Sequence, residues 1–176
     1  MKKLKLHELE RIGIEEYKQR DKLPIVIVLD NIRSLNNIGS FFRTADGFRV
    51  ERIILCGLTA TPPHKDIHKT ALGATDSVEW EYCDKTEYAV AGLKKDGYVL
   101  AAIEQCDDSI YLDKFVISQE NKYALIFGHE VKGVSQQVID LCDLAIEIPQ
   151  YGTKHSFNVS VSAGILMWEF SKQYKQ

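Results

Sequence analysis

The sequence has 176 residues, 45% of them hydrophobic, which is enough for one domain with a substantial core and too little for two such domains. Its formal net charge of −3 does not by itself indicate a nucleic-acid partner, and no apolar run is long enough to span a membrane or form a signal peptide. We therefore expect a single domain over residues 1–176 in a soluble, cytoplasmic protein with no membrane partner.

The net charge hides an uneven distribution. Residues 1–75 contain 13 Lys and Arg against 9 Asp and Glu, whereas residues 76–176 contain 9 against 16. All the arginines lie in the first 52 positions: Arg11, Arg20, Arg33, Arg43, Arg49 and Arg52. Because the guanidinium fork suits phosphate, a polyanion should meet the N-terminal part of the fold. Arg11, Arg20 and Arg49 are explained more simply as solvated surface.

The pattern of apolar residues predicts an α/β fold. Apolar residues at near-helical spacing predict an amphipathic N-terminal helix over residues 3–20, and the β-branched run at 25–29 is typical of a strand buried on both faces of a parallel sheet. Strands and helices then alternate, which predicts a parallel sheet flanked by helices. The further strands are expected at 52–56, 77–82, 98–103, 123–127 and 145–148, and the further helices at 37–48, 65–72, 85–95, 135–142 and 158–172.

Residues 106–120 lack clear periodicity, so we expect a loop with at most one turn of helix there. No Gly-x-Gly-x-x-Gly follows any expected strand, which argues against a dinucleotide site. The segment between Gly128 and Gly133 superficially suggests a phosphate loop. However, Val134 stands where that loop needs a lysine, so nucleoside triphosphate hydrolysis is excluded.

The cysteines and histidines give no sign of a disulfide framework or a metal centre. His64 and His68 are four residues apart without a third ligand, so we expect no metal. The cysteines are widely spaced with no Cys-x-x-Cys pair, and we expect them to be reduced and mostly buried: Cys56, Cys83, Cys106 and Cys142.

A polar loop and an Asn-rich helix start follow the first expected strand. Asn36 or Asn37 is a natural N-cap for that helix, which would explain either residue. Arg43 is harder to explain as surface, because the apolar residues around it suggest a partly buried guanidinium that needs a partner.

Two later loops, both in the last fifty residues, also follow apolar strands. Glu130 lies in a turn between two glycines and is either a turn residue or an ion-pair partner for an arginine. Ser156 and Asn158 lie near the start of the last helix, where one of them should be a cap. Because the carboxyl ends of parallel strands meet at one edge of the sheet, these loops should converge on a ligand pocket walled by main chain.

Three segments stand out in order along the chain: Asn37-Ile38-Gly39-x3-Arg43-Thr44-Ala45, Phe127-Gly128-His129-Glu130-x2-Gly133-Val134-Ser135 and Ile148-Pro149-x2-Gly152-x3-Ser156-Phe157-Asn158-Val159-Ser160-Val161. In order and spacing they resemble the three motifs of the SpoU (TrmH) family of RNA ribose 2′-O-methyltransferases, in the SPOUT superfamily. The resemblance extends over residues 25–170 and includes Lys69-Thr70-Ala71-Leu72-Gly73-Ala74. Phe157 departs from the usual leucine, which affects only the expected shape of the pocket.

The resemblance implies an S-adenosylmethionine-dependent enzyme with a deep trefoil knot in its C-terminal third. It also implies a homodimer whose active site uses residues of both subunits. Ordinary topology rules argue against a knot, so that expectation depends on the resemblance alone. The residues that it places around the cofactor, largely through backbone groups, are Ile103, Glu104, Gly128, His129, Glu130, Ile148, Ser156, Phe157 and Asn158.

The resemblance also assigns catalytic roles. Arg43 takes the position of the catalytic arginine, and we expect it to hold an RNA phosphate and favour the emerging ribose alkoxide. Glu130 would orient an arginine, Asn37 would order the catalytic loop, and Ser156 and Asn158 would shape the ribose and methionine end of the site.

The RNA-binding surface is expected to include Arg33, Arg43, Lys65 and Lys69, together with the N-terminal helix and the dimer surface. With no room for a separate RNA-binding domain before Ile25, tRNA is favoured over rRNA as the substrate. Two alternatives remain at this point: a non-catalytic RNA-binding protein of the same fold, and a base-directed RNA methyltransferase.

Overall fold

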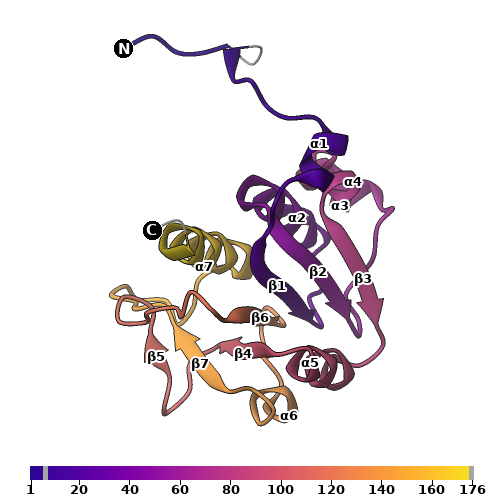
Figure 1. The fold of residues 1–176 in the computed structure, drawn as a ribbon. Coiled ribbons are helices and arrows are strands. Elements are labelled where there is room, and N and C mark those ends of the chain that lie inside the picture. Colours follow the sequence, from indigo (N-terminus) through magenta and orange to yellow (C-terminus); the bar gives the residue numbers. More distant parts are fainter. Residues whose placement is uncertain (6–7, 175–176) are drawn as a thin grey trace.

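The computed structural model describes residues 1–5 and 8–174. Its centre is a parallel sheet of seven strands in the order β3-β2-β1-β6-β4-β7-β5 (Figure 1). The parallel sheet predicted from the sequence is therefore confirmed. The strands are β1 (Leu23–Asp30), β2 (Val50–Cys56), β3 (Glu79–Cys83), β4 (Tyr98–Ile103), β5 (Ile110–Tyr111), β6 (Lys122–Gly128) and β7 (Leu144–Glu147).

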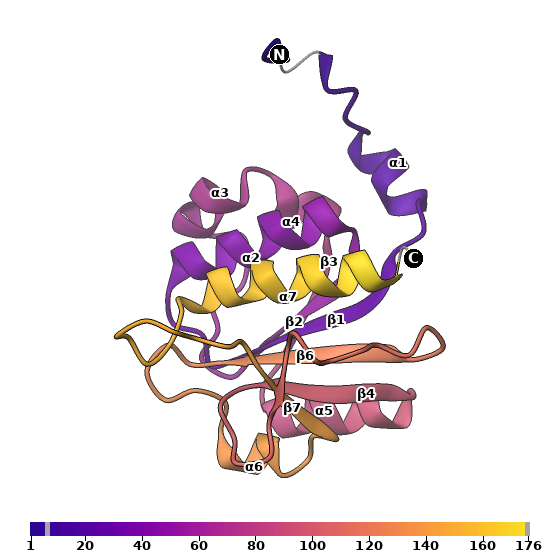
Figure 2. The same cartoon turned by 90° about the vertical axis from the view of Figure 1, so that its left-hand side faces the viewer.

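Helices cover both faces of the sheet. The helices α2 and α7 lie side by side on one face with α3 and α4 beside α2, whereas α5 and α6 lie on the other face (Figure 2). None of the helices in the described ranges is both long and apolar enough to cross a membrane. The helices are α1 (Ile14–Gln19), α2 (Leu35–Phe48), α3 (Lys65–Ala71), α4 (Ala74–Ser77), α5 (Thr86–Lys95), α6 (Gln136–Ile139) and α7 (Val159–Tyr174).

The strand β1 shows how the sheet divides the core into two layers. Successive side chains of a strand point to opposite faces. Ile25, Ile27 and Leu29 accordingly pack in the cluster beneath α2 and α7, whereas Val26 and Val28 pack in the cluster beneath α5 and α6. All five side chains are fully buried, which is why this run has no polar alternation.

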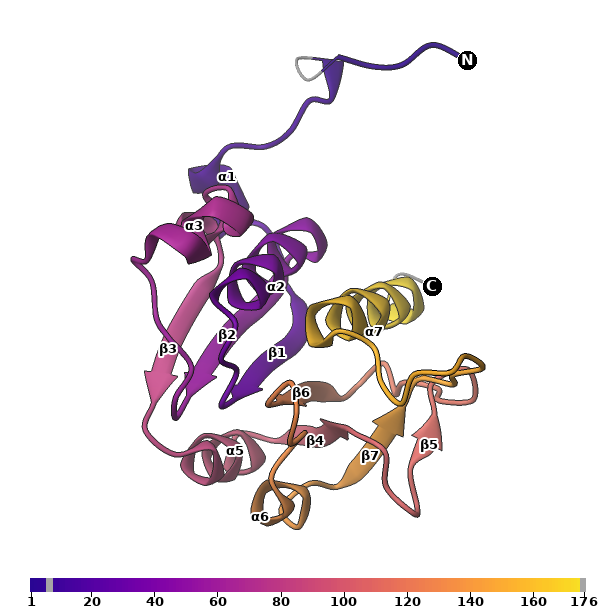
Figure 3. The same ribbon diagram turned by 180° about the vertical axis from the view of Figure 1, so that it is seen from behind.

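The N-terminal segment differs from its prediction. The only α-helix in the described part of residues 3–20 is α1, which begins after Gly13, and Glu10 adopts a left-handed φ of 46°. Residues 8–13 lead away from the body of the fold (Figure 3), and Ile12 and Ile14 stay exposed. Without a surface to bury its apolar stripe, a longer helix gains no tertiary stabilisation. Residues 6 and 7 of the predicted helix lie outside the described residues.

Three smaller differences concern the connections. Residues 106–120 contain the two-residue edge strand β5 rather than a turn of helix, and α4 precedes β3 where no helix was predicted. The helix predicted over 135–142 is the single turn α6.

All four cysteines are free, but only Cys56 is fully buried, so the expected burial is wrong for the others.

Candidate functional site

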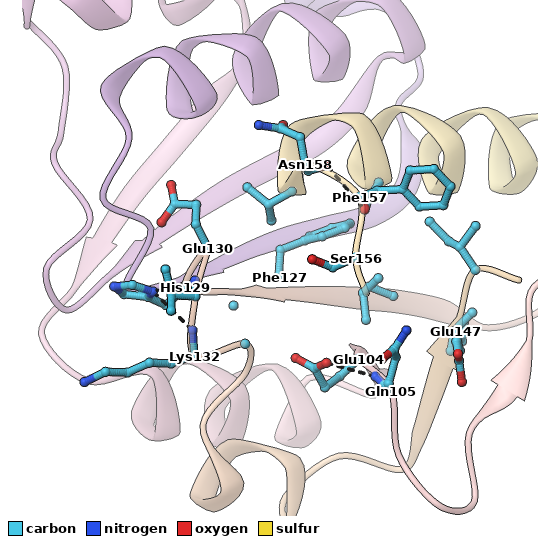
Figure 4. A pocket seen from close by; sticks show the side chains of 18 of the residues that line it. Glu104, Gln105, Phe127, His129, Glu130, Lys132, Glu147, Ser156, Phe157 and Asn158 are labelled. Atoms are coloured by element: carbon cyan, nitrogen blue, oxygen red, sulfur yellow. Dashed lines mark hydrogen bonds between the residues drawn. The ribbon is translucent and has the colours of Figure 1, made fainter. Parts of the chain in front are cut away.

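A cavity of about 500 Å³ lies at the carboxyl ends of β4, β6 and β7, where the motif-bearing loops meet (Figure 4). Volumes of this size are typical of small-molecule sites. The structure brings all nine residues predicted around the cofactor into its lining. Sequence reasoning missed other lining residues: Gln105, Phe127, Val131, Lys132, Gly133, Ile146, Glu147, Gln150, Val159 and Ser162.

Two glycines let the loop after β6 approach its neighbours closely. A Cβ atom at Gly128 would collide with the backbone of Gly133 and Val134, and one at Gly133 would collide with the carboxylate of Glu104. Gly133 also has a φ of 68°, a region that L side chains rarely adopt. The Glu104 carboxylate accepts hydrogen bonds from the backbone N–H of Val134, at 3.0 Å, and of Gln105, at 2.9 Å. Glu104 thus fixes the loop against the end of β4.

Glu130 joins the loop after β6 to the start of α2. Its carboxylate accepts hydrogen bonds from the backbone N–H of Arg33 (3.1 Å) and Ser34 (2.9 Å) and from the Asn37 side-chain amide (3.1 Å). Burial alone would raise its pKa, but these donated hydrogen bonds outweigh burial and lower the pKa of Glu130. No arginine side chain pairs with Glu130 within the described residues, where its carboxylate binds main-chain groups at a helix N-terminus instead.

Asn37 and Asn158 complete a network between the first and third loops. The Asn158 amide donates to the Asn37 side-chain oxygen at 3.2 Å, and Asn37 in turn donates to Glu130. The N-cap of α2 is Ser34, which accepts from the Asn37 backbone N–H, so the expected cap at Asn36 or Asn37 is wrong. The cap expected before the last helix is confirmed at Asn158, whose side chain accepts from the Ser160 backbone N–H at 2.9 Å.

Asp30 is a buried carboxylate that sequence reasoning overlooked. It ends β1 and is only 2% exposed. It accepts hydrogen bonds from the Thr86 hydroxyl at 2.6 Å, the Asn31 amide at 2.8 Å and the Ser135 backbone N–H at 3.1 Å. Three elements are thereby joined below the cavity: β1, the start of α5 and the loop after β6. A carboxylate directly after an all-apolar strand was the signal that could have revealed it.

Arg43 lies outside the cavity. Its side chain is exposed and makes no hydrogen bond or ion pair within the described residues, so the prediction of a partly buried guanidinium is wrong. Phe41, Phe42 and Ala45 face the core, and helical geometry places Arg43 on the opposite side of α2. There it lines a separate hollow of about 800 Å³ with residues of α1, α4 and the segment before α1.

The other predicted substrate-binding residues are distributed around the fold. Arg33 is exposed beside the cavity, where its backbone binds Glu130, whereas Lys65 and Lys69 are exposed on α3, away from the cavity lining. Ser156 lines the cavity and its hydroxyl makes no hydrogen bond within the described residues. Within these same ranges, no group of three His, Cys, Asp or Glu side chains is placed to hold a metal ion.

Comparisons with known proteins identify relatives over most of the chain. A family model described as the SpoU rRNA Methylase family matches residues 24–168. A protein of Staphylococcus haemolyticus assigned to the TrmH family of tRNA/rRNA methyltransferases is 29% identical over 163 residues, which is 93% of this chain and 64% of that protein. This chain thus spans slightly less than two thirds of the length of these curated relatives.

Solved structures show the same fold. The TrmH/SpoU tRNA modifying enzyme of A. aeolicus superimposes with a TM-score of 0.80 at 25% identity, over 92% of this chain and 80% of that one. An AdoMet-bound rRNA methyltransferase from Sinorhizobium meliloti superimposes with a TM-score of 0.78 at 22% identity, over 94% of this chain and 62% of that one.

Proposed function

The chain belongs to the SpoU family of RNA methyltransferases, and from this premise we propose that it methylates a ribose 2′-hydroxyl of RNA with S-adenosylmethionine as the methyl donor. The observation that carries the proposal is the network of Asn37, Glu130 and Asn158. These residues come from three separate motifs: Glu130 and Asn158 line one cavity, and Asn37 is hydrogen-bonded to both. Caps that served only their own helices would not need to bind one another.

The cavity fits S-adenosylmethionine on chemical grounds. Phe127 and Ile148 provide apolar walls for an adenosyl group, and the carboxylates of Glu104 and Glu147 suit the positive charges of the sulfonium and ammonium groups. The nine predicted cofactor residues would hold it, largely through main-chain groups of the three loops. When bound, this cofactor supplies a methyl group that is already activated for transfer. The protein has mainly to position the ribose hydroxyl and assist the loss of its proton.

Arg43 supports the proposal that the protein acts as a homodimer. It lies in a different hollow from the cofactor cavity, so the catalytic cation and the methyl donor do not meet within one chain. On α7, Val161 and Trp168 are exposed apolar residues, and Trp168 is 60% exposed where it contacts Phe48 of α2. Such a face suits burial against a second copy. Arg43 of one subunit then serves the cavity of the other.

Within that dimer each side chain has a defined task. Arg43 binds the phosphate next to the target ribose and stabilises the developing alkoxide electrostatically. A guanidinium with a pKa above about 12 is a poor base, so the phosphate or water accepts the proton. Asn37 and Glu130 hold the loop before α2 in place, while Ser156 and Asn158 line the ribose and methionine end of the cavity.

The deep C-terminal trefoil knot and the preference for tRNA over rRNA belong to the same proposal. Two features support the knot: β7 lies beyond β4 although it follows β6 in the chain, and α7 returns to pack beside α2 (Figure 2). The exposed cations Arg33, Lys65 and Lys69 support direct RNA binding by this chain.

Nucleoside mapping tests the function. RNA from cells lacking the protein should lack one 2′-O-methylnucleoside, and the purified protein with S-adenosylmethionine should restore it. The position of that nucleoside identifies the RNA. Loss of a base-methylated nucleoside instead would indicate a base-directed enzyme, and cofactor binding without methyl transfer to any RNA would indicate a non-catalytic RNA-binding protein.

A further inference from the structure

The turn after β6 presents a hydrogen-bond donor whose orientation the backbone fixes. The Nδ1 atom of His129 accepts hydrogen bonds from the backbone N–H of Val131, at 3.0 Å, and of Lys132, at 3.4 Å. A ring nitrogen that accepts cannot carry the proton, so the neutral imidazole carries its proton on Nε2. Among the described residues nothing accepts a hydrogen bond from Nε2. His129 therefore offers a free N–H group at the lining of the cavity.

One cation, Lys132, lies beside this donor, and a second, Arg33, is joined to the same side of the cavity through its backbone. Lys132 is exposed, lines the same cavity, and makes no ion pair within the described residues. His129 and Lys132 lie together on the side of the cavity where Glu130 stands, opposite Gln105 and Glu147 (Figure 4). Arg33 is joined to that side because its backbone N–H binds Glu130 at 3.1 Å. The Glu130 carboxylate keeps its negative charge, but it is directed at the start of α2, where it accepts three hydrogen bonds, and it forms no ion pair with Lys132 or Arg33 within the described residues.

We propose that His129 Nε2–H, Lys132 and Arg33 form a phosphate-binding rim that holds the RNA strand at the cavity. This inference rests on the proposed function, which makes RNA the polyanion that reaches the cavity. It gives the His129 side chain a substrate contact, leaves the His129 main chain among the cofactor contacts, and adds Lys132 to the substrate-binding residues. A neutral N–H donor orients a phosphate oxygen, and the two flexible cations supply charge. The rim is separate from Arg43, which lines the other hollow.

The carboxylate of S-adenosylmethionine is a second anion that the same rim suits. Substitutions distinguish binding of this carboxylate from binding of an RNA phosphate. His129→Asn keeps an acceptor near the position of Nδ1, as Asn does in turns, but removes the Nε2 donor. Lys132→Gln removes one charge, and Lys95→Gln is the matched control, because Lys95 is exposed on α5, outside the cavity lining. Binding of a short oligouridylate is measured against salt, and binding of S-adenosylmethionine is measured by calorimetry.

We expect His129→Asn to weaken oligouridylate binding about tenfold without changing its salt dependence. Lys132→Gln should weaken binding and reduce the salt slope by about 0.7. Both variants should bind S-adenosylmethionine like the wild type, and Lys95→Gln should change neither ligand's affinity. A melting temperature of the His129→Asn variant equal to that of the wild type would show that the variant still forms the turn after β6.

Wild-type oligouridylate affinity in both variants would overturn the inference, as would lost cofactor affinity with unchanged RNA affinity, since the anion would then be the cofactor's carboxylate. If His129→Asn unfolds early, Lys132→Gln and an Arg33→Gln variant decide the question by their salt slopes. A wild-type protein that binds oligouridylate through this rim yet methylates no RNA would overturn the proposed function rather than the rim.

Discussion

The start and the middle of α2 have different surroundings. At its start, Ser34 and Asn37 are tied to Glu130 of the loop after β6, and Asn37 also binds Asn158 before α7. Two turns further along, Arg43 is exposed and makes no hydrogen bond or ion pair within the described residues. The helix α2 therefore carries Asn37, which hydrogen bonds within the chain hold in place, and Arg43, which the described residues leave without a partner.

The difference indicates which part of the site one chain forms by itself and which part is left free to bind a ligand. Hydrogen-bonded groups at the start of α2 stabilise the loops that wall the cavity, so one chain can form a methyl-donor pocket by itself. An unpartnered guanidinium suits a ligand that arrives from outside, because no internal partner has to be displaced. The following predictions test whether the cofactor cavity and the Arg43 hollow can be separated in experiments.

The largest effect is expected from Arg43→Ala. Loss of a cation that stabilises transition-state charge should slow methyl transfer by about 10²- to 10³-fold, while S-adenosylmethionine affinity stays unchanged. Single-turnover methyl transfer and calorimetry measure the two quantities. Arg20→Ala is the control, because Arg20 is exposed on the C-terminal side of α1 and, within the described residues, pairs only with Glu16.

Mixing Arg43→Ala subunits with Asn158→Ala subunits tests whether Arg43 acts in its own cavity or in that of the partner subunit. If Arg43 serves the cavity of the partner subunit, subunit exchange creates one intact site per mixed dimer and part of the activity returns. Continued inactivity of the mixture, with exchange verified, would show that each chain uses its own Arg43.

Gly128→Ala should damage the cofactor cavity alone. Its Cβ atom would collide with the backbone of Gly133 and Val134, neither of which can rotate away. We expect a loss of about 3 kcal/mol in the free energy of unfolding, together with weaker cofactor binding. Urea denaturation and calorimetry measure both. Gly164→Ala is a matched control, because no atom beyond its chain neighbours and the adjacent backbone of α7 lies within 4 Å of its Cβ position in the described structure. Equal effects in both variants would refute the steric argument.

Glu130→Ala leaves two backbone N–H groups and the Asn37 amide without their acceptor. Stability should fall by about 2 kcal/mol, which for a protein of this size lowers the melting temperature by several degrees. The loss also depends on pH. Because the folded protein lowers the Glu130 pKa below its ordinary value of 4.5, its stabilising contribution is complete above that value and disappears as the pH falls through the folded pKa.

Urea midpoints of the wild type and of Glu130→Gln therefore measure the same contribution in a second way. The difference between them should be constant near neutral pH and shrink as the pH falls below 4.5. A difference that grows on acidification would have the wrong sign and would contradict the stabilising role of the Glu130 hydrogen bonds at the start of α2.

The smallest effect is expected from Tyr17→Phe, on the Arg43 side. Tyr17 lines the same hollow as Arg43, is 4% exposed, and has a buried hydroxyl without a hydrogen-bond partner in the described ranges. Removing an unsatisfied hydroxyl should raise the free energy of unfolding by at most about 1 kcal/mol. A clear loss of stability in urea denaturation would mean that a partner for this hydroxyl exists in solution.

Sequence patterns predicted the sheet and the convergence of the loops, because both depend on local periodicity and on the rule that parallel strands end together. They failed where tertiary context decides. The apolar neighbours of Arg43 indicated burial, but a helix of 3.6 residues per turn places adjacent residues on different faces. Two of the three partners of Glu130 are main-chain N–H groups, which the identity of a residue cannot reveal. The strand β5 has two residues, too few for any period.

The position of β6 has a consequence for synthesis of the protein. It is the central strand and pairs with β1 on one side and β4 on the other, yet it comes after both in the chain. Until residue 128 leaves the ribosome, β1 and β4 each keep an open edge of unpaired N–H and C=O groups, which invites aggregation. The nascent chain must therefore be shielded through most of translation, and chaperone dependence during expression should end only when the final third of the polypeptide emerges.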